Sequence, residues 1–198
     1  MRLARLVNEL MPGEPEVLSL LALLLFTAAR RPARVDAAGD PVPLGDQDRT
    51  RWDHAAIAEA SGLLAEAVRR SGGVAGPYQL QAHLSACHST APSYADTDWD
   101  RIVGLYDLLL SLSANPAVAL NRAVAVTERD GPAAGLAALD AITGMGRWHL
   151  WHAARAEALA RLGDTGQARD ALRQALELAP TGPERRLLAR RLAEMPPP

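Results

Sequence analysis

The stretch His149–Pro180, HLWHAARAEALARLGDTGQARDALRQALELAP, decides the fold. Small residues recur in it at Ala156, Ala168 and Ala175. Two antiparallel helices joined by a short turn would meet at Ala156 and Ala168, because only small side chains let two helix backbones cross closely. Ala175 would then face the next pair of helices. The stretch therefore predicts a helical hairpin that stacks on its neighbours.

The large residues and the turn of this stretch agree with a hairpin. Leu159 and Leu172 fall where large side chains fill the wedge between the two helices. Gly163 lies in the turn, where the end of a helix favours a residue that tolerates positive φ, and Pro180 closes the unit. This is the pattern of the tetratricopeptide repeat (TPR), which has a period of about 34 residues. It indicates a scaffold that binds other proteins rather than an enzyme.

A second unit of the same kind lies upstream. Each of three positions in it lies 33 residues before a small residue of the stretch just described. Ala123, Gly135 and Ile142 correspond in this way to Ala156, Ala168 and Ala175. The sequence predicts TPR-like units at 116–148 and 149–181, followed by a capping helix at 184–195.

Apolar periodicity predicts helices in the rest of the chain as well, about nine in all. Leu3, Leu6, Val7 and Leu10 share one helical face with no capping residue before it, so the chain is expected to begin inside a repeat. The segment 46–70 is expected to form one long helix, and the segment 32–45 a loop with a turn at 38–40.

Composition supports the same fold class. Aromatic residues make up only 4% of the 198 residues, and the abundance of Ala and Leu favours close-packed helices over pleated sheets. We expect a single all-α domain over 1–198, a TPR-like array of antiparallel helical hairpins with essentially no β-sheet.

Charge and cysteine content limit the possible partners. A net charge of −2 provides no positive field for nonspecific binding to nucleic acid. The apolar run 17–26 is shorter than the roughly 20 residues that span a bilayer, so no membrane partner is expected. The single cysteine, Cys87, excludes an internal disulfide and is compatible with a reducing compartment. The sequence thus predicts a cytoplasmic protein.

Five segments resemble, in order, the C-terminal extension of a group of extracytoplasmic-function (ECF) sigma factors. They are LLALLLFTAARRPARVDAAGD from Leu20, LGDQDRTRWDHAAIAEA from Leu44, GPYQLQAHLSACH from Gly76, DTDWDRIVGLYDLLL from Asp96 and NPAVALNRAVAV from Asn115. The resemblance spans essentially the whole chain and implies a TPR-like extension of a sigma factor.

The resemblance also implies how such a domain works. Sigma regions 2 and 4, which bind core RNA polymerase and read the promoter, would lie upstream, and neither is present in this chain. Promoter DNA would be contacted only through those regions. The expected partners are the sigma regions of the same polypeptide, core RNA polymerase, or both. The expected function is noncatalytic docking that modulates transcription initiation.

The segment DQDRTRW supplies the first candidate interaction residues: Asp46, Asp48, Arg49 and Trp52. One interpretation is structural, because carboxylates at a helix start accept hydrogen bonds from free N–H groups and interact favourably with the helix dipole. The other is a recognition surface in which Asp48 and Arg49 bind a partner and Trp52 anchors the contact.

Two further pairs complete the candidate surface. Tyr78 and Gln81 follow Pro77, which suits the first turn of a helix; they either pin the neighbouring loop by hydrogen bonds or extend a binding groove. Asn121 and Arg122 lie on the first helix of the unit 116–148. They either join helices and carry surface charge, or line a groove suited to an apolar helix or extended segment.

Catalytic and metal-binding residues are not predicted. His83 and Cys87 share a helix face, but no second Cys or His pair lies nearby to complete a zinc site. Cys87 and His88 are adjacent, so on a helix they point about 100° apart and cannot act as a nucleophile and base. No cofactor and no small-molecule substrate are expected. The alternative to a sigma-factor domain is a free-standing TPR-like adaptor that binds an unrelated peptide.

Overall fold

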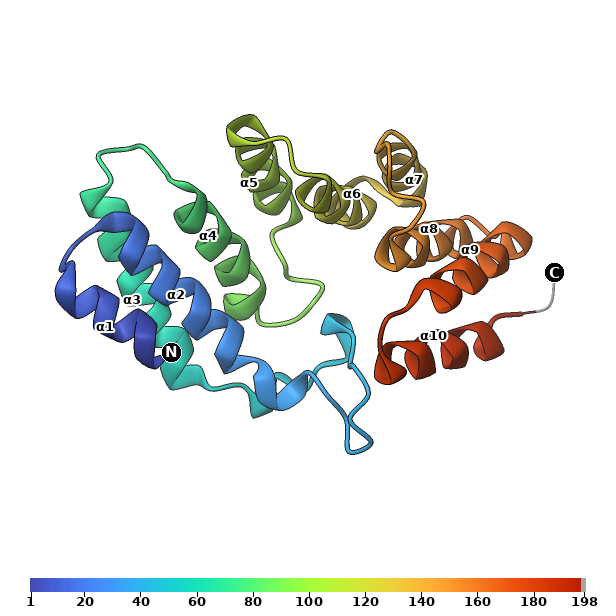
Figure 1. Cartoon of the computed structure of the whole chain (residues 1–198), viewed down its shortest axis with the longest axis horizontal. Coiled ribbons are helices and arrows are strands. Elements are labelled where there is room, and N and C mark those ends of the chain that lie inside the picture. Colours follow the sequence, from blue (N-terminus) through green and yellow to red (C-terminus); the bar gives the residue numbers. More distant parts are fainter. Residues whose placement is uncertain (197–198) are drawn as a thin grey trace. The chain divides into compact units, whose positions relative to one another are not determined.

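The computed structural model describes residues 1–196, and within them it contains ten α-helices and no β-strand (Figure 1). The helices are α1 (Arg2–Leu10), α2 (Pro15–Ala29), α3 (His54–Arg70), α4 (Pro77–Thr90), α5 (Trp99–Leu112), α6 (Pro116–Asp130), α7 (Pro132–Asp140), α8 (His149–Arg161), α9 (Thr165–Leu178) and α10 (Gly182–Glu194). Three short 3-10 helices lie between α2 and α3: η1 (Arg31–Ala33), η2 (Leu44–Asp46) and η3 (Arg49–Arg51). The all-α prediction is confirmed, with ten helices where about nine were expected.

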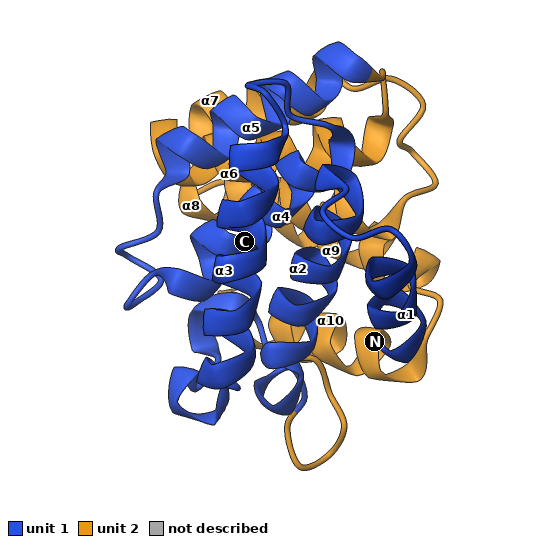
Figure 2. Ribbon diagram, turned by 90° about the vertical axis from the view of Figure 1, so that its left-hand side faces the viewer, with its two compact units in different colours: residues 1–35, 42–112 blue, residues 36–41, 113–198 orange. Residues whose placement is uncertain are grey.

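The chain divides into two compact units, shown in different colours in Figure 2. Unit 1 comprises residues 1–35 and 42–112, and unit 2 comprises residues 36–41 and 113–198. The predicted range 1–198 thus contains two units, and each is described by itself.

Unit 1 is built around α2. This helix is apolar on nearly every side, so it is buried on several sides by α1, α3 and α4. Ala22 and Phe26 are fully buried in it, and Trp52, from the segment before α3, joins the same core. Helix α5 packs on α4 and buries Ile102 and Val103.

Unit 2 is a succession of hairpins. Helix α6 pairs with α7 and α8 pairs with α9, while α7 contacts α8 and α9 contacts α10. The small residues predicted at the crossings, Ala156, Ala168 and Ala175, are at most 4% exposed. Gly163 adopts φ +84° in the turn between α8 and α9, and Asp164 caps α9 by accepting from the Gln167 N–H. The helices α6 to α10 lie within the predicted ranges 116–148, 149–181 and, apart from the first two residues of α10, 184–195.

The predicted helix over 46–70 is wrong in its first part, because α3 begins only at His54. The Asp53 carboxylate accepts a hydrogen bond of 2.9 Å from the Ala56 N–H and so caps α3. The Asp48 carboxylate does the same for Thr50 in η3. Asp side chains that accept hydrogen bonds from nearby N–H groups compete with helical hydrogen bonds. The residues between Asp48 and Asp53 therefore form the short η3 helix and do not extend α3.

Candidate interaction surfaces

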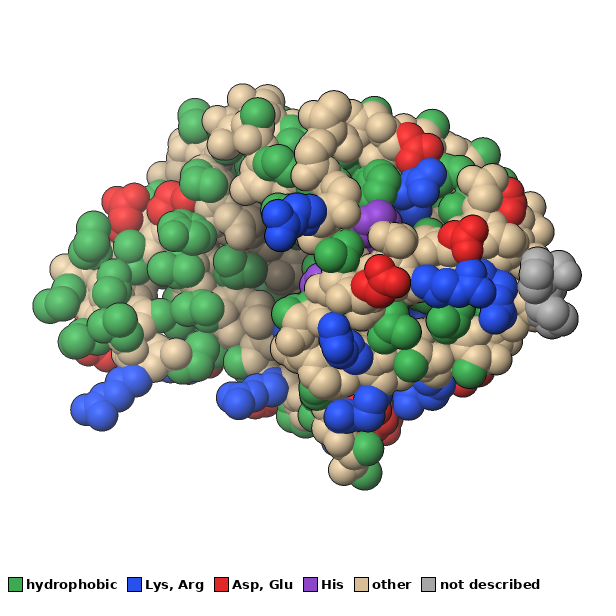
Figure 3. Space-filling model, turned by 45° about the vertical axis from the view of Figure 1, so that its right-hand side comes forward, with side chains coloured by type: hydrophobic (Ala, Val, Ile, Leu, Met, Phe, Trp, Pro, Cys, Tyr) green, Lys and Arg blue, Asp and Glu red, His purple; other side chains and the backbone are tan. Residues whose placement is uncertain are grey.

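Helix α1 exposes a continuous apolar face. Leu3, Leu6 and Leu10 are 73%, 48% and 72% exposed, although they lie on one side of the helix, and only Ala4 is buried. Figure 3 shows hydrophobic side chains gathered on the side of the molecule that carries α1, at the left of the view. A contiguous apolar surface of this kind marks a binding face more often than three scattered leucines would.

Two of the four candidate residues of the segment DQDRTRW, Arg49 and Trp52, are buried or half-buried. Trp52 is only 4% exposed, and the Arg49 guanidinium lies over its ring at 4.5 Å from the centroid. One terminal nitrogen of Arg49 also donates to the carbonyl oxygens of His88 and Ala91, at 3.0 and 2.8 Å, and so ties η3 to the end of α4.

The two carboxylates of this segment are exposed. Hydrogen bonds from the side chain and the backbone of Thr50 lower the pKa of Asp48. The Asp48 carboxylate thus has its hydrogen-bond partners within the chain. Asp46 is the last residue of η2 and is exposed. A contact of the four residues with a partner stays a prediction.

Tyr78 lies in the first turn of α4 and Gln81 at the start of the second, so both follow Pro77 closely, as predicted. The Tyr78 side chain is 42% exposed, and Gln81 donates to the Pro77 carbonyl at 3.2 Å, within its own helix. The N-terminus of α4 is held by Glu16 of α2, whose carboxylate accepts from the N–H groups of Tyr78 and Gln79. Sequence reasoning missed Glu16, because its partner lies about sixty residues away in the chain.

Asn121 and Arg122 lie on α6 in unit 2. Asn121 is exposed, and Arg122 is half-buried, with its charge contributing to the lowered pKa of Asp130 after the larger effect of Arg129. Val124, one turn along, is 40% exposed. The helix therefore presents both a polar and an apolar group, and binding of a peptide there stays a prediction.

A groove of about 330 Å³ lies among α8, α9 and α10 in unit 2. Its apolar lining includes Ala153, Ala156, Ala160 and Leu172, and its charged lining includes Glu157, Arg191 and Glu194. Sequence reasoning placed a groove on α6 and missed this one. Alanines at 153, 156 and 160 follow one face of a helix, but the groove above them forms only because α10 lies nearby, which this spacing does not give.

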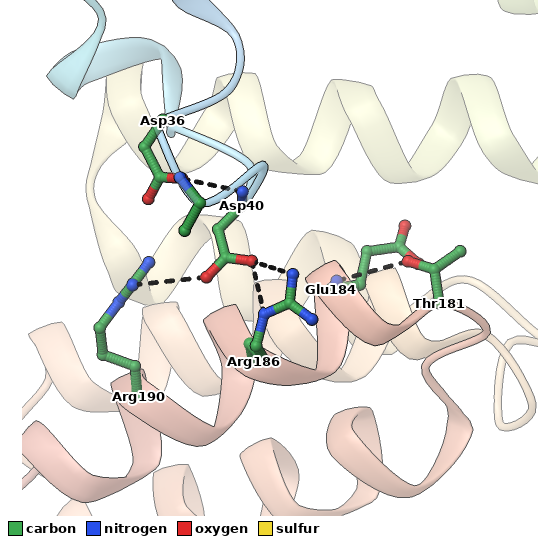
Figure 4. A network of polar contacts seen from close by, with 7 residues as sticks. Asp36, Asp40, Thr181, Glu184, Arg186 and Arg190 are labelled. Atoms are coloured by element: carbon green, nitrogen blue, oxygen red, sulfur yellow. Dashed lines mark hydrogen bonds and ion pairs between the residues drawn. The ribbon is translucent and has the colours of Figure 1, made fainter.

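The loop segment 36–41, which belongs to unit 2, is held on α10 by a buried carboxylate (Figure 4). The Asp40 side chain is 7% exposed and pairs with Arg186 at 2.6 Å and with Arg190 at 3.8 Å. The Asp36 carboxylate turns the loop by accepting from the N–H groups of Ala38 and Asp40, each at 2.9 Å. The predicted turn at 38–40 is thus present.

His83 and Cys87 do not meet a third metal ligand. Among residues 1–196, no three side chains of His, Cys, Asp or Glu form a group that could hold a metal ion. His83 instead faces Arg101, whose guanidinium lies 3.2 Å from Nδ1. Burial raises the pKa of the Cys87 thiol, so the thiol form is favoured over the reactive thiolate.

Residues 1–68 match the model of a family of unknown function, DUF6596. The chain is also similar to an uncharacterized protein of Rhizobium meliloti (strain 1021), with 41% identity over 184 residues. The alignment covers 92% of this chain but only 43% of that relative, so the chain spans less than half of the relative's length. No solved structure matches the chain. In the part of the chain that the structure describes, every helix is too short or too polar to cross a membrane.

Proposed function

We propose that the chain is a noncatalytic regulatory domain of an ECF sigma factor. It docks on the sigma regions or on core RNA polymerase and thereby modulates transcription initiation. The observation that carries this proposal is the exposed leucine face of α1, because an amphipathic helix with its apolar side in water gains free energy when a partner covers it.

The size of this gain favours specific docking. Full burial of one leucine side chain stabilises a complex by about 1.5–3 kcal/mol. Leu3 and Leu10 are both more than 70% exposed, so most of that free energy is still available to a partner. Arg2 and Glu9 lie beside the stripe and are exposed, and they would set the orientation of a partner helix.

The comparisons agree with a domain that works within a longer polypeptide. The relative of Rhizobium meliloti is more than twice as long as the segment it shares with this chain. The match to the family model covers α1, α2 and most of α3, which include the exposed face and the helices behind it. The five segments that resemble the sigma-factor extension supply the identity of the proposed partners.

The test is a binding measurement on the intact chain with two probes, purified core RNA polymerase and the sigma regions of an ECF sigma factor from the same source. Leu10→Glu places a charge in the exposed leucine face and should weaken binding at least tenfold. The matched control is Leu150→Glu, which changes a 55% exposed leucine on α8 and should leave binding unchanged. Absence of binding to both probes at moderate salt would contradict the proposal.

The groove of unit 2 favours a second candidate, a TPR-like adaptor that binds a peptide. Its alanine floor would accept an apolar side chain, and Arg191 and Glu194 at its rim would fix the direction of the peptide. Ala160→Arg would fill the groove from its exposed edge and abolish such binding. Two results together would favour the adaptor over the sigma-factor domain. Ala160→Arg would abolish peptide binding, and Leu10→Glu would leave it unchanged.

A further inference from the structure

Five described side chains of unit 1 leave a nitrogen atom buried without a hydrogen-bond partner. Four of these atoms lie in one region: Nε of Arg30, one terminal nitrogen of Arg49, Nε1 of Trp52 and Nδ1 of His88. The fifth, Nε2 of Gln79, lies near the other end of α4 from His88. The arginine and tryptophan nitrogens can only donate. A buried donor without an acceptor is costly, and proteins satisfy more than nine in ten such groups. The nitrogens of Arg30, Arg49 and Trp52 are therefore three buried donors in one region that lack an acceptor.

Hydrogen bonds and a ring contact bring the four side chains together. Arg30 follows α2, and the Ala29 carbonyl just before it accepts from the Asp53 N–H at 3.0 Å, which places Trp52 beside the end of α2. Arg49 lies over the Trp52 ring at 4.5 Å and donates to the His88 carbonyl at 3.0 Å. The region is thus formed by the C-terminal ends of α2 and α4 and by η3. Arg30, Arg49 and His88 are only half-buried, so the region still meets solvent.

The charges of this region are unbalanced toward positive. Burial, followed by the charges of Arg34 and Arg49, lowers the pKa of Arg30 to about 10. Burial, followed by the charges of Arg30 and Arg49, lowers the pKa of His88 to about 4. The positive charges of neighbouring arginines therefore lower the pKa of both Arg30 and His88.

Two features of the chain offset this charge in part. Asp96 acts on Arg49 and raises its pKa, but burial outweighs that effect, and the Asp96 carboxylate accepts a hydrogen bond from Ser93 at 2.6 Å. The C-terminal ends of α2 and α4 carry partial negative charge, equivalent to about half an elementary charge each. Arg30, Arg49 and the neighbouring Arg34 together carry three positive charges against about two negative charges from Asp96 and the two helix ends. The helix ends also supply no acceptor to Arg30 Nε or to Trp52 Nε1.

We propose that Arg30, Arg49, Trp52 and His88 form a binding site for one small oxyanion, with the oxygen geometry of a phosphate or a carboxylate. An oxyanion supplies several acceptor oxygens and a negative charge at once, and guanidinium groups bind such oxygens through charge-assisted hydrogen bonds. The site does not depend on the docking face of α1, since it lies on different helices and binds a different kind of ligand. It would allow a small anion to stabilise unit 1.

The direct test is an NMR titration of the 198-residue chain with inorganic phosphate. The four tryptophans give four indole N–H signals, and Trp52→Phe identifies the one from Trp52. Phosphate or acetate should shift the Trp52 signal with saturation, whereas chloride at the same ionic strength should not. The stronger of the two ligands tells whether the site prefers a phosphate or a carboxylate. A shift with chloride of the same size would overturn the proposal.

A thermal-unfolding series provides the matched variants. Phosphate at about 100 times its dissociation constant should raise the Tm of the unaltered chain by about 5 °C. Arg30→Gln should remove this rise, and Arg30→Lys should reduce it, because an ammonium group lacks the planar pair of donors. Arg31→Gln is the control, since it removes the same charge from the exposed neighbouring residue and should keep the rise.

Two results would contradict the site. If phosphate neither shifts the Trp52 signal nor raises the Tm of the unaltered chain, the four side chains do not bind an oxyanion. If Arg30→Gln folds and keeps the full rise in Tm, phosphate binds elsewhere. The titration of the unaltered chain decides the question even if Arg30→Gln does not fold.

Discussion

The two units differ in the largest side chains that they bury, although both bury several alanines, such as Ala60 and Ala82 in unit 1. Unit 2 holds its central hairpin together with alanines, of which Ala168 and Ala175 are fully buried, and with leucines between them. Unit 1 buries bulky groups such as Phe26 and Trp52, and it also buries polar groups such as Gln79. The small residues at the crossings of unit 2 recur with the repeat, whereas the bulky buried side chains of unit 1 follow no such repeat.

Phe26→Ala should have the largest effect of the changes considered. Phe26 is fully buried at the centre of unit 1, and loss of a buried phenyl ring costs about 3–5 kcal/mol of unfolding free energy. Hydrogen exchange should speed up in α2, α3 and α4 and stay slow in α8 and α9. Leu108→Ala, which truncates a 53% exposed leucine on α5, should change the stability by less than about 0.5 kcal/mol. Equal loss of protection in both units would show that they unfold together.

Gly135→Ala tests the crossings of unit 2. A Cβ at Gly135 of α7 would lie 2.8 Å from the Thr127 Cα of α6, and this backbone atom cannot move aside alone. We expect a loss of about 2 kcal/mol in urea unfolding, despite the higher helix propensity of Ala. Gly104→Ala on α5 of unit 1 is the matched change, because the added Cβ would meet no atom within 4 Å. It should raise stability by about 0.5–1 kcal/mol, and the same sign for both changes would refute the difference between the units.

Unit 2 was the easier unit to predict from the sequence, for a physical reason. A close helix crossing favours small residues, so Ala156 and Ala168 indicated where the helices cross. Gly163 indicated the position of the turn in the same way. The start of α3 was missed because Asp46, Asp48 and Asp53 can all cap a helix, and only tertiary packing selects Asp53.

The candidate sites were harder to predict. The leucine stripe of α1 was visible as a periodicity, but its exposure depends on which helices cover α1. The buried donors of unit 1 come from residues 30, 49, 52 and 88, which no local pattern connects. The groove of unit 2 depends on the position of α10 over α8 and α9, and spacing along one helix does not give that position.

His88 gives unit 1 a dependence on pH. Burial, with the charges of Arg30 and Arg49, lowers the pKa of His88 from 6.5 to about 4 in the folded chain. As the pH falls from about 6.5 to about 4, the unfolded chain takes up the proton first, so stability is lost over that range and is fully present above it. The lowered pKa alone corresponds to about 3 kcal/mol. Because His88 is only half-buried and solvent screens its charge, we expect a loss of about 2 kcal/mol.

His88→Gln should remove this part of the pH dependence. Urea unfolding at several pH values, in a buffer without phosphate or carboxylate, measures the difference between the two slopes. His83 also has a lowered pKa, caused by burial and by Arg101, so a smaller slope of the same sign remains in the variant. Identical slopes for the two proteins would show that His88 is protonated at the same pH in the folded and unfolded chain.

Asp40→Asn should have the smallest effect and tests the assignment of residues 36–41 to unit 2. The carboxylate is buried, but Arg186 and Arg190 are about half exposed, so water compensates for much of the lost pairing. We expect a loss of about 1 kcal/mol, accompanied by faster hydrogen exchange in α10 and unchanged exchange in α2. Arg186→Gln should reproduce most of this loss and Arg190→Gln little of it, because Arg186 lies at 2.6 Å from the carboxylate and Arg190 at 3.8 Å. If exchange in α2 rises instead, the loop segment belongs energetically to unit 1, and the division between the two units has to be redrawn at Asp40.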